Sequence, residues 1–271
     1  MTQFIRTALF VPGSRPERFA KALAVGADTV IVDFEDAVEE SLKIQARDNL
    51  RSFLAEHPEA RVWVRINAAC HTEHTAELAL CRELDGVVGV MLPKAERAAQ
   101  VHGAASCGKP LWLLIESALG VLALPELAAC SGVQGMSYGA LDFALDLGLS
   151  TGTAGAQIML DQLRCALVLH SRVNDLQAPL ESVYPAFNDD QGLADAIRRS
   201  RDMGLGGALC IHPKQVAVVH AALAPTAEEL TWARRVVAAG ADGAAAYSLD
   251  GQMVDAPVIN RARRLLAAAG E

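Results

Sequence analysis

Aromatic residues are scarce in this chain of 271 residues, because Phe, Trp and Tyr together make up only 5% of it. Apolar residues nevertheless reach 52%, which excludes a disordered chain and leaves small aliphatic side chains to fill the core. The length suits one large domain or two small ones. The six cysteines include no CxxC pair. We therefore expect neither a zinc ribbon nor a disulfide framework, but reduced and mostly buried cysteines.

Basic residues are also in deficit, since 24 Lys and Arg against 32 Asp and Glu give a net charge of −8. This balance argues against a nucleic-acid partner, although a few arginines could still form a local anion site. No apolar run approaches the roughly 18 residues of a membrane span. The N-terminal stretch lacks the apolar segment and the cleavage site of a signal peptide. These absences predict a cytoplasmic protein without a membrane or nucleic-acid partner.

What the chain does contain is one unit repeated eight times, a short apolar run followed by a turn and an amphipathic helical stretch. Nearly continuous apolar runs are typical of parallel strands that are buried on both faces. Eight such units in roughly 220 residues predict an α/β fold of the (β/α)8 TIM-barrel class. A doubly wound open sheet is the alternative, but PGSRPE after the first run is not a GxGxxG turn. The predicted strands are 7–11, 29–34, 62–66, 88–92, 111–115, 134–138, 181–185 and 207–211.

The chain continues beyond the eighth unit, which divides it into a barrel domain, residues 1–225, and a C-terminal extension, residues 226–271. Thr226 and Glu229 have the spacing of a capping box and predict that a helix begins there. A turn-rich segment follows, and INRARRLLAAAG predicts a last, basic amphipathic helix. We expect this helical extension to act as a lid over the barrel mouth or to pack on a neighbouring subunit.

Charged residues follow nearly every predicted strand, at the end where barrels of this class carry their chemistry. Glu116 and Asp142 are 26 residues apart, about one repeat, so they should lie side by side on this rim. Two carboxylates with open coordination positions suit Mg²⁺, which also binds water and substrate oxygens. The alternative is a structural ion pair between Glu116 and either Arg65 or Lys94.

Arg65 leaves the third predicted strand on the same rim. A guanidinium suits a carboxylate or an enolate oxygen better than an ammonium does, because its N–H donors are held in a fixed planar arrangement. The alternative is an ordinary ion pair between Arg65 and Asp33, Glu35 or Asp36 on the neighbouring strand.

Two further groups of residues are candidates for ligand contacts. Arg15 and Lys21 lie near the start of the first crossover helix, where backbone N–H groups also attract anions, although a solvated helix face explains them equally well. His212 follows the eighth strand and precedes Pro213, which favours a role in shaping a turn or packing on a ligand over a general base. The chain has no GxSxG elbow and no prominent Cys/His pair.

Taken together, a series of motifs resembles the citrate lyase β-subunit-like family of the HpcH/HpaI aldolase superfamily, which includes malyl-CoA and citramalyl-CoA lyases. The resemblance runs from about residue 6 to 269 with similar order and spacing. It implies a TIM barrel, usually a homotrimer, that uses Mg²⁺ to cleave or form a carbon–carbon bond next to a thioester. The motifs are LFVPGSRPERFAKAL, VIVDFEDAV, VWVRIN, VMLPKAE, LLIES, SYGALDFALDLG, LCIHPKQV and DGQMVDAPVINRAR.

The resemblance also implies a role for each candidate residue. Arg65 would grip the keto acid, and Asp255 would be the acid/base that reaches the site from a neighbouring subunit. At the metal, Glu116 and Asp142 would be the Mg²⁺ ligands, and Glu35 and Asp36 would support metal-bound water. The backbone N–H groups of Gly139, Ala140 and Leu141 would bind the substrate carboxylate. For coenzyme A, Arg15 and Lys21 would contact the phosphates, and His212 and Pro213 would form the wall of the pocket.

These roles predict a lyase that cleaves a β-hydroxyacyl-CoA, of citramalyl-CoA or malyl-CoA type, to acetyl-CoA and a keto acid. A citrate lyase β-chain acting on citryl-acyl carrier protein and a keto-acid aldolase that needs no coenzyme A are the alternative enzymes. A non-catalytic ligand-binding protein on a decayed barrel is a third possibility, but it would not require Glu116, Asp142, Arg65 and Asp255 all to be present.

Overall fold

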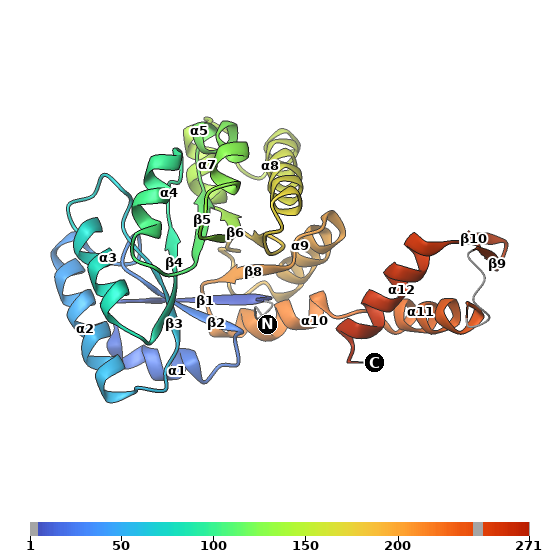
Figure 1. The fold of residues 1–271 in the computed structure, drawn as a ribbon, viewed down its shortest axis with the longest axis horizontal. Helices are drawn as coiled ribbons and strands as arrows, with labels where there is room; N and C mark the ends of the chain where they lie inside the picture. Colours follow the sequence, from blue (N-terminus) through green and yellow to red (C-terminus); the bar gives the residue numbers. More distant parts are fainter. Residues whose placement is uncertain (1–4, 241–245, 271) are drawn as a thin grey trace. The chain divides into compact units, whose positions relative to one another are not determined.

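The computed structural model describes residues 5–240 and 246–270, and the chain divides into two compact units, Met1–Ala222 and Leu223–Glu271. The first unit is built on eight parallel strands with helices outside them (Figure 1). Neighbouring strands follow the order β6-β5-β4-β3-β2-β1-β8-β7. The strands are β1 (Thr7–Pro12), β2 (Thr29–Asp33), β3 (Val62–Arg65), β4 (Val87–Leu92), β5 (Leu111–Ile115), β6 (Val133–Tyr138), β7 (Leu180–Glu181) and β8 (Gly207–Cys210).

The two ends of this sheet, β6 and β7, meet through individual hydrogen bonds. The Ser137 hydroxyl donates to the Leu180 carbonyl at 3.0 Å, and the Gln177 N–H donates to the Gln134 carbonyl at 2.9 Å. The result is a nearly closed barrel, which confirms the predicted TIM-barrel class.

One strand differs from its predicted bounds by more than one residue at an end. Residues 181–185 were expected to form the seventh strand, but β7 ends at Glu181. Pro185 has no N–H to donate to a strand ladder, and the segment before it leaves the sheet as a loop. That loop carries Ser182 to the rim where the candidate site lies.

Tryptophan, not only small aliphatic side chains, fills the inside of the barrel. Trp63 and Trp112 meet edge to face with ring centroids 6.0 Å apart, and both belong to the central apolar cluster. Gly89 and Gly135 make room for them, because a Cβ at either position would lie within 2.5 Å and 2.8 Å of an indole atom, respectively. The expectation of an aliphatic core was therefore incomplete, because glycine on a neighbouring strand can accommodate a large ring.

The helices of the first unit cover the outside of the barrel (Figure 1). Among the described residues, none of the helices is both long enough and apolar enough to cross a bilayer. Two short 3₁₀ turns, Pro16–Arg18 and Glu40–Leu42, precede the first two helices. The helices are α1 (Phe19–Leu23), α2 (Lys43–Glu56), α3 (His74–Glu83), α4 (Ala98–Ala105), α5 (Ala118–Leu122), α6 (Leu124–Ala128), α7 (Ala140–Asp146), α8 (Ala154–Val173), α9 (Asp190–Met203) and α10 (Pro213–Leu223).

The second unit has two helices, α11 (Ala227–Ala239) and α12 (Ala256–Ala268), and an antiparallel hairpin of β9 (Tyr247–Leu249) and β10 (Gln252–Val254). The capping box of Thr226 and Glu229 is present as predicted. The hairpin was not foreseen, although Asp250 and Gly251 at its turn both have positive φ, as tight hairpins require. Residues 241–245 and 271 of the predicted extension lie outside the described part of the chain.

Candidate active site

Acidic side chains gather where β2, β5 and β6 end, because the carboxyl ends of parallel strands lie on one rim. Asp33 is the last residue of β2, Glu116 follows β5 directly, and Asp142 lies in the first turn of α7 after β6. Glu35 and Glu116 are 6% and 4% exposed, so both carboxylates are removed from bulk water. Glu116 and Asp142, which the sequence predicted to be side by side, therefore lie on the same rim.

Arg65, the last residue of β3, is held by the carboxylates of the neighbouring strand. Its Nε and Nη2 donate to the two oxygens of Asp33 at 2.7 and 2.6 Å. Its Nη1 lies 3.1 Å from both Glu35 Oε2 and Asp36 Oδ2. The ion-pair alternative for Arg65 is thus present, and it fixes the guanidinium over the Phe10 ring at 4.8 Å.

Lys94 supplies the second cation of this rim and lies just beyond β4. Its Nζ donates to Glu35 Oε1 at 2.9 Å and lies 3.3 Å from Asp142 Oδ2. The same nitrogen is 3.9 Å from Glu116 Oε2, so the alternative ion pair of Glu116 forms with Lys94. Burial opposes the charge of this ammonium, but the carboxylates outweigh it and raise the pKa of Lys94.

Negative charge exceeds positive charge in this part of the described chain, and the pKa values respond to the excess. Burial, followed by the charge of Glu35, raises the pKa of Glu116 to about 9. Burial likewise raises the pKa of Glu35 in spite of Arg65 and Lys94. Burial alone would raise the pKa of Asp142, but its hydrogen bond with Glu116 and the charge of Lys94 lower it. The members of this rim cluster are Asp33, Glu35, Asp36, Glu116 and Asp142, with Arg65 and Lys94 as cations.

The rim cluster has the donor set of a divalent-cation site. Glu116 Oε1 is buried and has no hydrogen-bond partner among the described residues. An orphaned carboxylate oxygen beside a second carboxylate, Asp142, is what a hard cation would bind. Within residues 5–240 and 246–270, no group of three or more His, Cys, Asp or Glu side chains encloses a metal position. The chain would therefore supply two ligands and leave the others to water or substrate.

A cavity of about 110 Å³ lies against the rim cluster. Arg65, Glu116 and Asp142 form its polar side. Phe10, Leu114, Val183 and Leu209 form its apolar side. A polar and an apolar wall facing each other suit a small carboxylic acid with a short alkyl group.

The backbone of residues 139–141 lines the same cavity, but its N–H groups are not all available. The Gly139 N–H donates to the Ile115 carbonyl at 3.0 Å, and the Ala140 N–H donates to the Ser182 hydroxyl at 3.1 Å. The expected three-donor contact to a substrate carboxylate is therefore reduced to Leu141, unless Ser182 gives up its bond.

A second cavity, of about 360 Å³, shares Phe10 with the first and opens beside α1 and α10. Lys21, His212 and Pro213 line it, as does Arg18, so three of the four residues expected at a coenzyme A pocket come together. Arg15 is not among the lining residues. Its exposed side chain lies 3.9 Å from Glu17 instead.

The ring of His212 belongs to this second cavity and is fixed from two sides. It stacks on Phe187 with centroids 5.2 Å apart and an angle of 17° between the planes. Its Nδ1 accepts the Lys214 N–H at 3.2 Å. These contacts favour the packing role that the sequence suggested.

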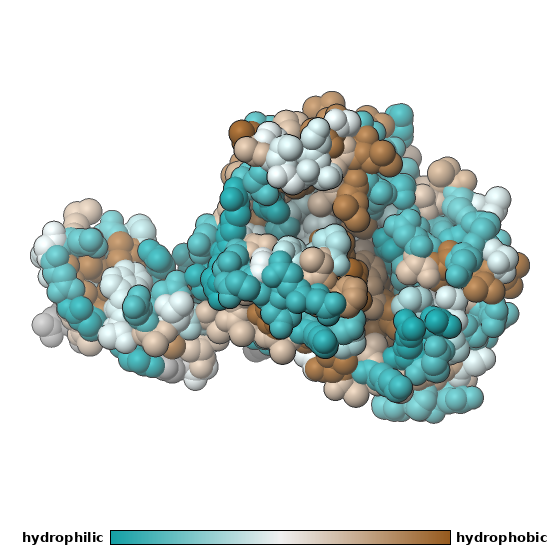
Figure 2. All heavy atoms as spheres, turned by 180° about the vertical axis from the view of Figure 1, so that it is seen from behind, coloured by the Kyte–Doolittle hydropathy of each residue, from teal (hydrophilic) through white to brown (hydrophobic). Residues whose placement is uncertain are grey.

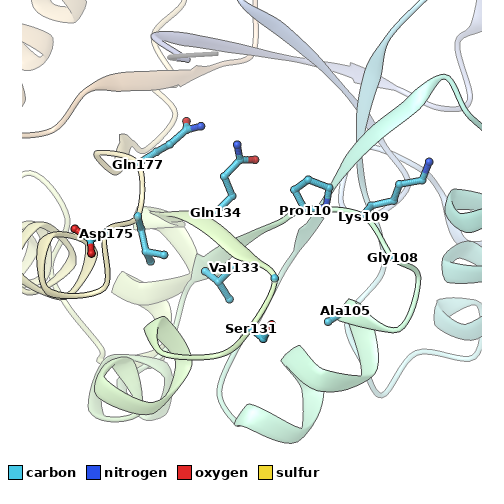
Figure 3. Close-up of a pocket in the computed structure, with 11 residues that line it drawn as sticks. Ala105, Gly108, Lys109, Pro110, Ser131, Val133, Gln134, Asp175 and Gln177 are labelled. Atoms are coloured by element: carbon cyan, nitrogen blue, oxygen red, sulfur yellow. The ribbon is translucent and has the colours of Figure 1, made fainter. Parts of the chain in front are cut away.

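The largest of the described cavities, about 600 Å³, lies at the other end of the barrel, where β5 and β6 begin (Figure 3). Its polar lining comes from the α4–β5 connection, from β6 and from the α8–β7 connection, and consists of Lys109, Gln134, Asp175 and Gln177. The rim cluster has no residue in it, so this cavity belongs to a different face from the candidate site.

Several important residues received no functional role from the sequence, in which Asp33 and Lys94 were considered only as alternative ion-pair partners. Asp33 and Lys94 both stand at strand ends, which was the available signal. Behind the cavity, Arg164 of α8 donates to both oxygens of Glu181 at 2.8 and 2.9 Å, and Tyr138 donates to the same carboxylate. This buried network supports the loop that carries Ser182. In the sequence, the signal for it was a charged residue, Arg164, on the apolar face of a helix.

Asp255 lies in the second unit, at the N-terminus of α12. Its carboxylate accepts the Val258 N–H at 3.4 Å and thereby caps the helix. Pro257 occupies the second position of the helix, where its missing N–H costs no hydrogen bond.

Comparisons with known proteins agree with this geometry. A model described as HpcH/HpaI aldolase/citrate lyase matches residues 6–213, and one described as a C–C bond lyase of the TIM-barrel fold matches residues 166–270. A citrate lyase subunit beta-like protein of Mycobacterium tuberculosis strain H37Rv is 40% identical over 97% of this chain and 95% of its own length. A (3S)-malyl-CoA thioesterase of Cereibacter sphaeroides is 32% identical over 97% of this chain and 94% of its own length.

A solved structure is similar along the whole chain. The crystal structure of protein CitE from Mycobacterium tuberculosis in complex with magnesium, acetoacetate and coenzyme A matches with a TM-score of 0.90 and 38% identity. The match covers 100% of both chains.

Proposed function

Because the chain belongs to the HpcH/HpaI aldolase/citrate lyase family and is a lyase by that membership, we propose that it cleaves a β-hydroxyacyl-CoA, of citramalyl-CoA or malyl-CoA type, to acetyl-CoA and a keto acid. The observation that carries this proposal is the rim cluster with its orphaned oxygen, Glu116 Oε1, directly beside a cavity sized for a small acid. The similar CitE structure, which holds magnesium, acetoacetate and coenzyme A, supports it.

Mg²⁺ is the cofactor that we propose, held by Glu116 and Asp142. Glu35 and Asp36 lie within the same rim cluster and would accept hydrogen bonds from its water ligands. When bound, the cation supplies Lewis-acid polarisation of the substrate oxygens.

Arg65 is the substrate-binding and catalytic cation in this proposal. Asp33 holds its guanidinium in one orientation, so the group is preorganised and needs no rearrangement during the reaction. Its position on the polar wall of the smaller cavity suits a keto-acid carboxylate or the negative charge that develops on an oxygen during cleavage. Leu141 lines the same cavity, and its N–H would add one donor.

The coenzyme A part of the substrate would lie in the larger cavity. Lys21 offers a cation for phosphate, and His212 and Pro213 form the wall beside it. Arg15 lies outside this lining, at the exposed start of the first crossover, where it would contact only a phosphate that extends to the surface. Phe10 borders both cavities, so a thioester could join the two parts there.

Asp255 is our proposed acid/base. In cleavage it would accept the proton of the substrate hydroxyl as the carbon–carbon bond breaks, and a proton returned to the acetyl carbon would give acetyl-CoA. We propose residues 1–225 as the catalytic barrel and 226–271 as an extension that brings Asp255 to the site of a neighbouring subunit.

A homotrimer in the cytoplasm is the assembly that we propose. Exposed leucines project from two neighbouring helices, with Leu122 of α5 at 80% and Leu145 of α7 at 82% exposure. Figure 2 shows apolar side chains gathered on the surface in this region, at the top of the view. Exposed apolar patches of this kind mark protein–protein contacts. Leu141 of α7 is 59% exposed and also lines the smaller cavity, so a neighbour seated there would reach the site.

Thioester hydrolysis is a second candidate, because a relative with 32% identity carries that activity in its name. The products separate the two reactions. Cleavage of malyl-CoA yields glyoxylate and acetyl-CoA without a free thiol, whereas hydrolysis yields malate and the free thiol of coenzyme A. Each CoA ester would be assayed with and without Mg²⁺ for keto acid and thiol in parallel.

Keto acid without thiol, dependent on Mg²⁺, is the expected result. Thiol without keto acid would replace the lyase assignment by a thioesterase. Turnover of citryl-acyl carrier protein but of no CoA ester would indicate a citrate lyase β-chain, and turnover of a free hydroxy acid would indicate an aldolase that needs no coenzyme A. Failure on every substrate would favour a binding protein.

A further inference from the structure

Lys94 lies at the centre of the rim cluster, and its backbone conformation directs it there. The residue follows Pro93 after β4 and has φ of +49°, which non-glycine residues rarely adopt. Its ammonium contacts Glu35 Oε1 at 2.9 Å and Asp142 Oδ2 at 3.3 Å. A strained backbone conformation that places one ammonium among several carboxylates indicates a specific electrostatic role.

The carboxylates that face Lys94 are the two that we propose as metal ligands. Asp142 Oδ2 and Glu116 Oε2 lie 3.3 and 3.9 Å from its nitrogen. A Mg²⁺ ion bound at the usual distance of about 2.1 Å from oxygens of the same two carboxylates would repel the ammonium and compete with it for their negative charge.

We propose that the ammonium of Lys94 and a divalent cation are alternative occupants of the rim cluster, so that cation binding releases Lys94 to solvent. The inference rests on the proposed function only in that the cluster holds a divalent cation. Lys94 thereby acts as the internal counter-ion of the cation-free protein.

The two cations of the cluster differ in their freedom to leave. The Lys94 side chain is 42% exposed, and its shortest contact is the hydrogen bond to Glu35 at 2.9 Å. The Arg65 side chain is 11% exposed and is fixed by two hydrogen bonds to Asp33. Lys94 is therefore the cation that exchanges, whereas Arg65 stays in place for the substrate.

Amine modification of the wild-type protein tests the exchange without any substitution. The folded protein is treated briefly with a water-soluble acylating reagent, with MgCl₂ or with NaCl of equal ionic strength, and Lys94 is followed by peptide mass spectrometry. We expect its modification to be about tenfold faster with Mg²⁺, the factor that corresponds to losing one charge-assisted hydrogen bond. Lys109, at the opposite end of the barrel, is the internal control and should not change. An unchanged or slower rate at Lys94 would overturn the proposal.

Cation affinity gives a second, independent measurement. Mn²⁺ binding by electron paramagnetic resonance compares the wild type with Lys94→Ala, and with Lys109→Ala as the matched loss of one charge. Removing the competitor should tighten binding about tenfold in Lys94→Ala, whereas Lys109→Ala should stay within about twofold, because screening weakens a distant charge. Weaker binding in Lys94→Ala would show that Lys94 supports the cation instead. A wild-type protein that binds no Mn²⁺ would contradict the proposed metal site and the exchange together, whereas Mn²⁺ binding with no gain in Lys94→Ala would contradict the exchange alone.

Discussion

Asp33 and Arg65, the last residues of the neighbouring strands β2 and β3, form an ion pair with two hydrogen bonds. The two carboxylate oxygens of Asp33 accept from Nε and Nη2 of Arg65 at 2.7 and 2.6 Å. The pair is buried, with side chains 1% and 11% exposed. It explains how a flexible arginine can present one fixed face to a small cavity.

The first prediction follows from that pair. Arg65→Lys keeps the charge but cannot make two parallel bonds to Asp33 and still face the substrate. We expect kcat for CoA-ester cleavage to fall about 100-fold, as a misplaced positioning group can cause. Steady-state assays of keto-acid release measure the loss. Unchanged Mn²⁺ affinity would show that the cation site is intact, and kcat within a few-fold of wild type would contradict the role.

The second prediction concerns Glu116, whose buried carboxylate lies in an excess of negative charge. Glu116→Gln keeps the shape while removing an anionic ligand, and it also removes the cost that folding near neutral pH carries for protonating this buried carboxyl, whose pKa is raised to about 9. We expect the metal-free variant to melt at a higher temperature than the wild type, and to lose the stabilisation that Mg²⁺ gives the wild type, because a ligand stabilises only the state that it binds.

Thermal unfolding with MgCl₂ and with EDTA measures both effects. Glu126→Gln, which changes a first-turn residue of α6, is the matched control and should respond to Mg²⁺ as the wild type does. A variant that is still stabilised by Mg²⁺ would place the cation on other groups.

The barrel and the position of the rim cluster could be predicted from the sequence, for a physical reason. Parallel strands buried on both faces read as apolar runs, and the residue after each run must lie on one rim. Glu116 and Asp142 could be paired in this way without a structure. The partners of Arg65 were among the stated alternatives for the same reason.

The remaining features depend on contacts that spacing does not encode. Trp63 and Trp112 fit inside the barrel because glycines on adjacent strands leave room, which a single run does not reveal. The Ala140 N–H is occupied because Ser182, far along the chain, accepts it. The central place of Lys94 depends on a positive φ that few lysines adopt.

The third prediction concerns stability at the other end of the barrel. Asp28, just before β2, accepts the N–H groups of Arg6 and Thr7 at 2.8 and 3.0 Å, and it lies 3.3 Å from His220 Nε2. Burial would raise the pKa of Asp28, but the hydrogen bonds from Arg6 lower it below its ordinary 3.8. Since the folded protein holds this carboxylate ionised more strongly than the unfolded chain does, its stabilisation is present above pH 3.8 and is lost as the pH falls through the lower folded pKa.

Asp28→Asn should therefore lower the free energy of unfolding at pH 7 by about 1–3 kcal/mol, the usual cost of mismatched buried hydrogen bonds. The difference from wild type should shrink at pH 3. Urea unfolding at both pH values measures it. Asp48→Asn, with its side chain 68% exposed, should change stability by no more than about 0.5 kcal/mol. An equal difference at both pH values would mean that the ionised form contributes nothing.

The fourth prediction separates two roles of Asp255, as acid/base and as the cap of α12. Asp255→Ala removes both, whereas Asp255→Ser keeps an oxygen that can cap the helix but has no carboxylate. We expect both variants to lose turnover, while Mn²⁺ affinity and keto-acid binding stay near those of the wild type. Asp250→Asn, in the exposed turn of the β9–β10 hairpin that precedes α12, should stay active. Recovery of activity in Asp255→Ser would reduce Asp255 to a cap.

Subunit exchange tests where Asp255 acts. If the extension reaches the barrel of a neighbour, a mixed oligomer of Asp255→Ala and Arg65→Ala subunits contains some sites with an intact Arg65 from one chain and an intact Asp255 from another. Mixing equal amounts of the two inactive proteins under conditions that allow exchange should then restore about one quarter of the activity for a trimer with each site shared by two chains, because each site draws its two residues at random from the two variants. Activity that stays absent, although mass spectrometry shows mixed oligomers, would require Asp255 to act within its own chain.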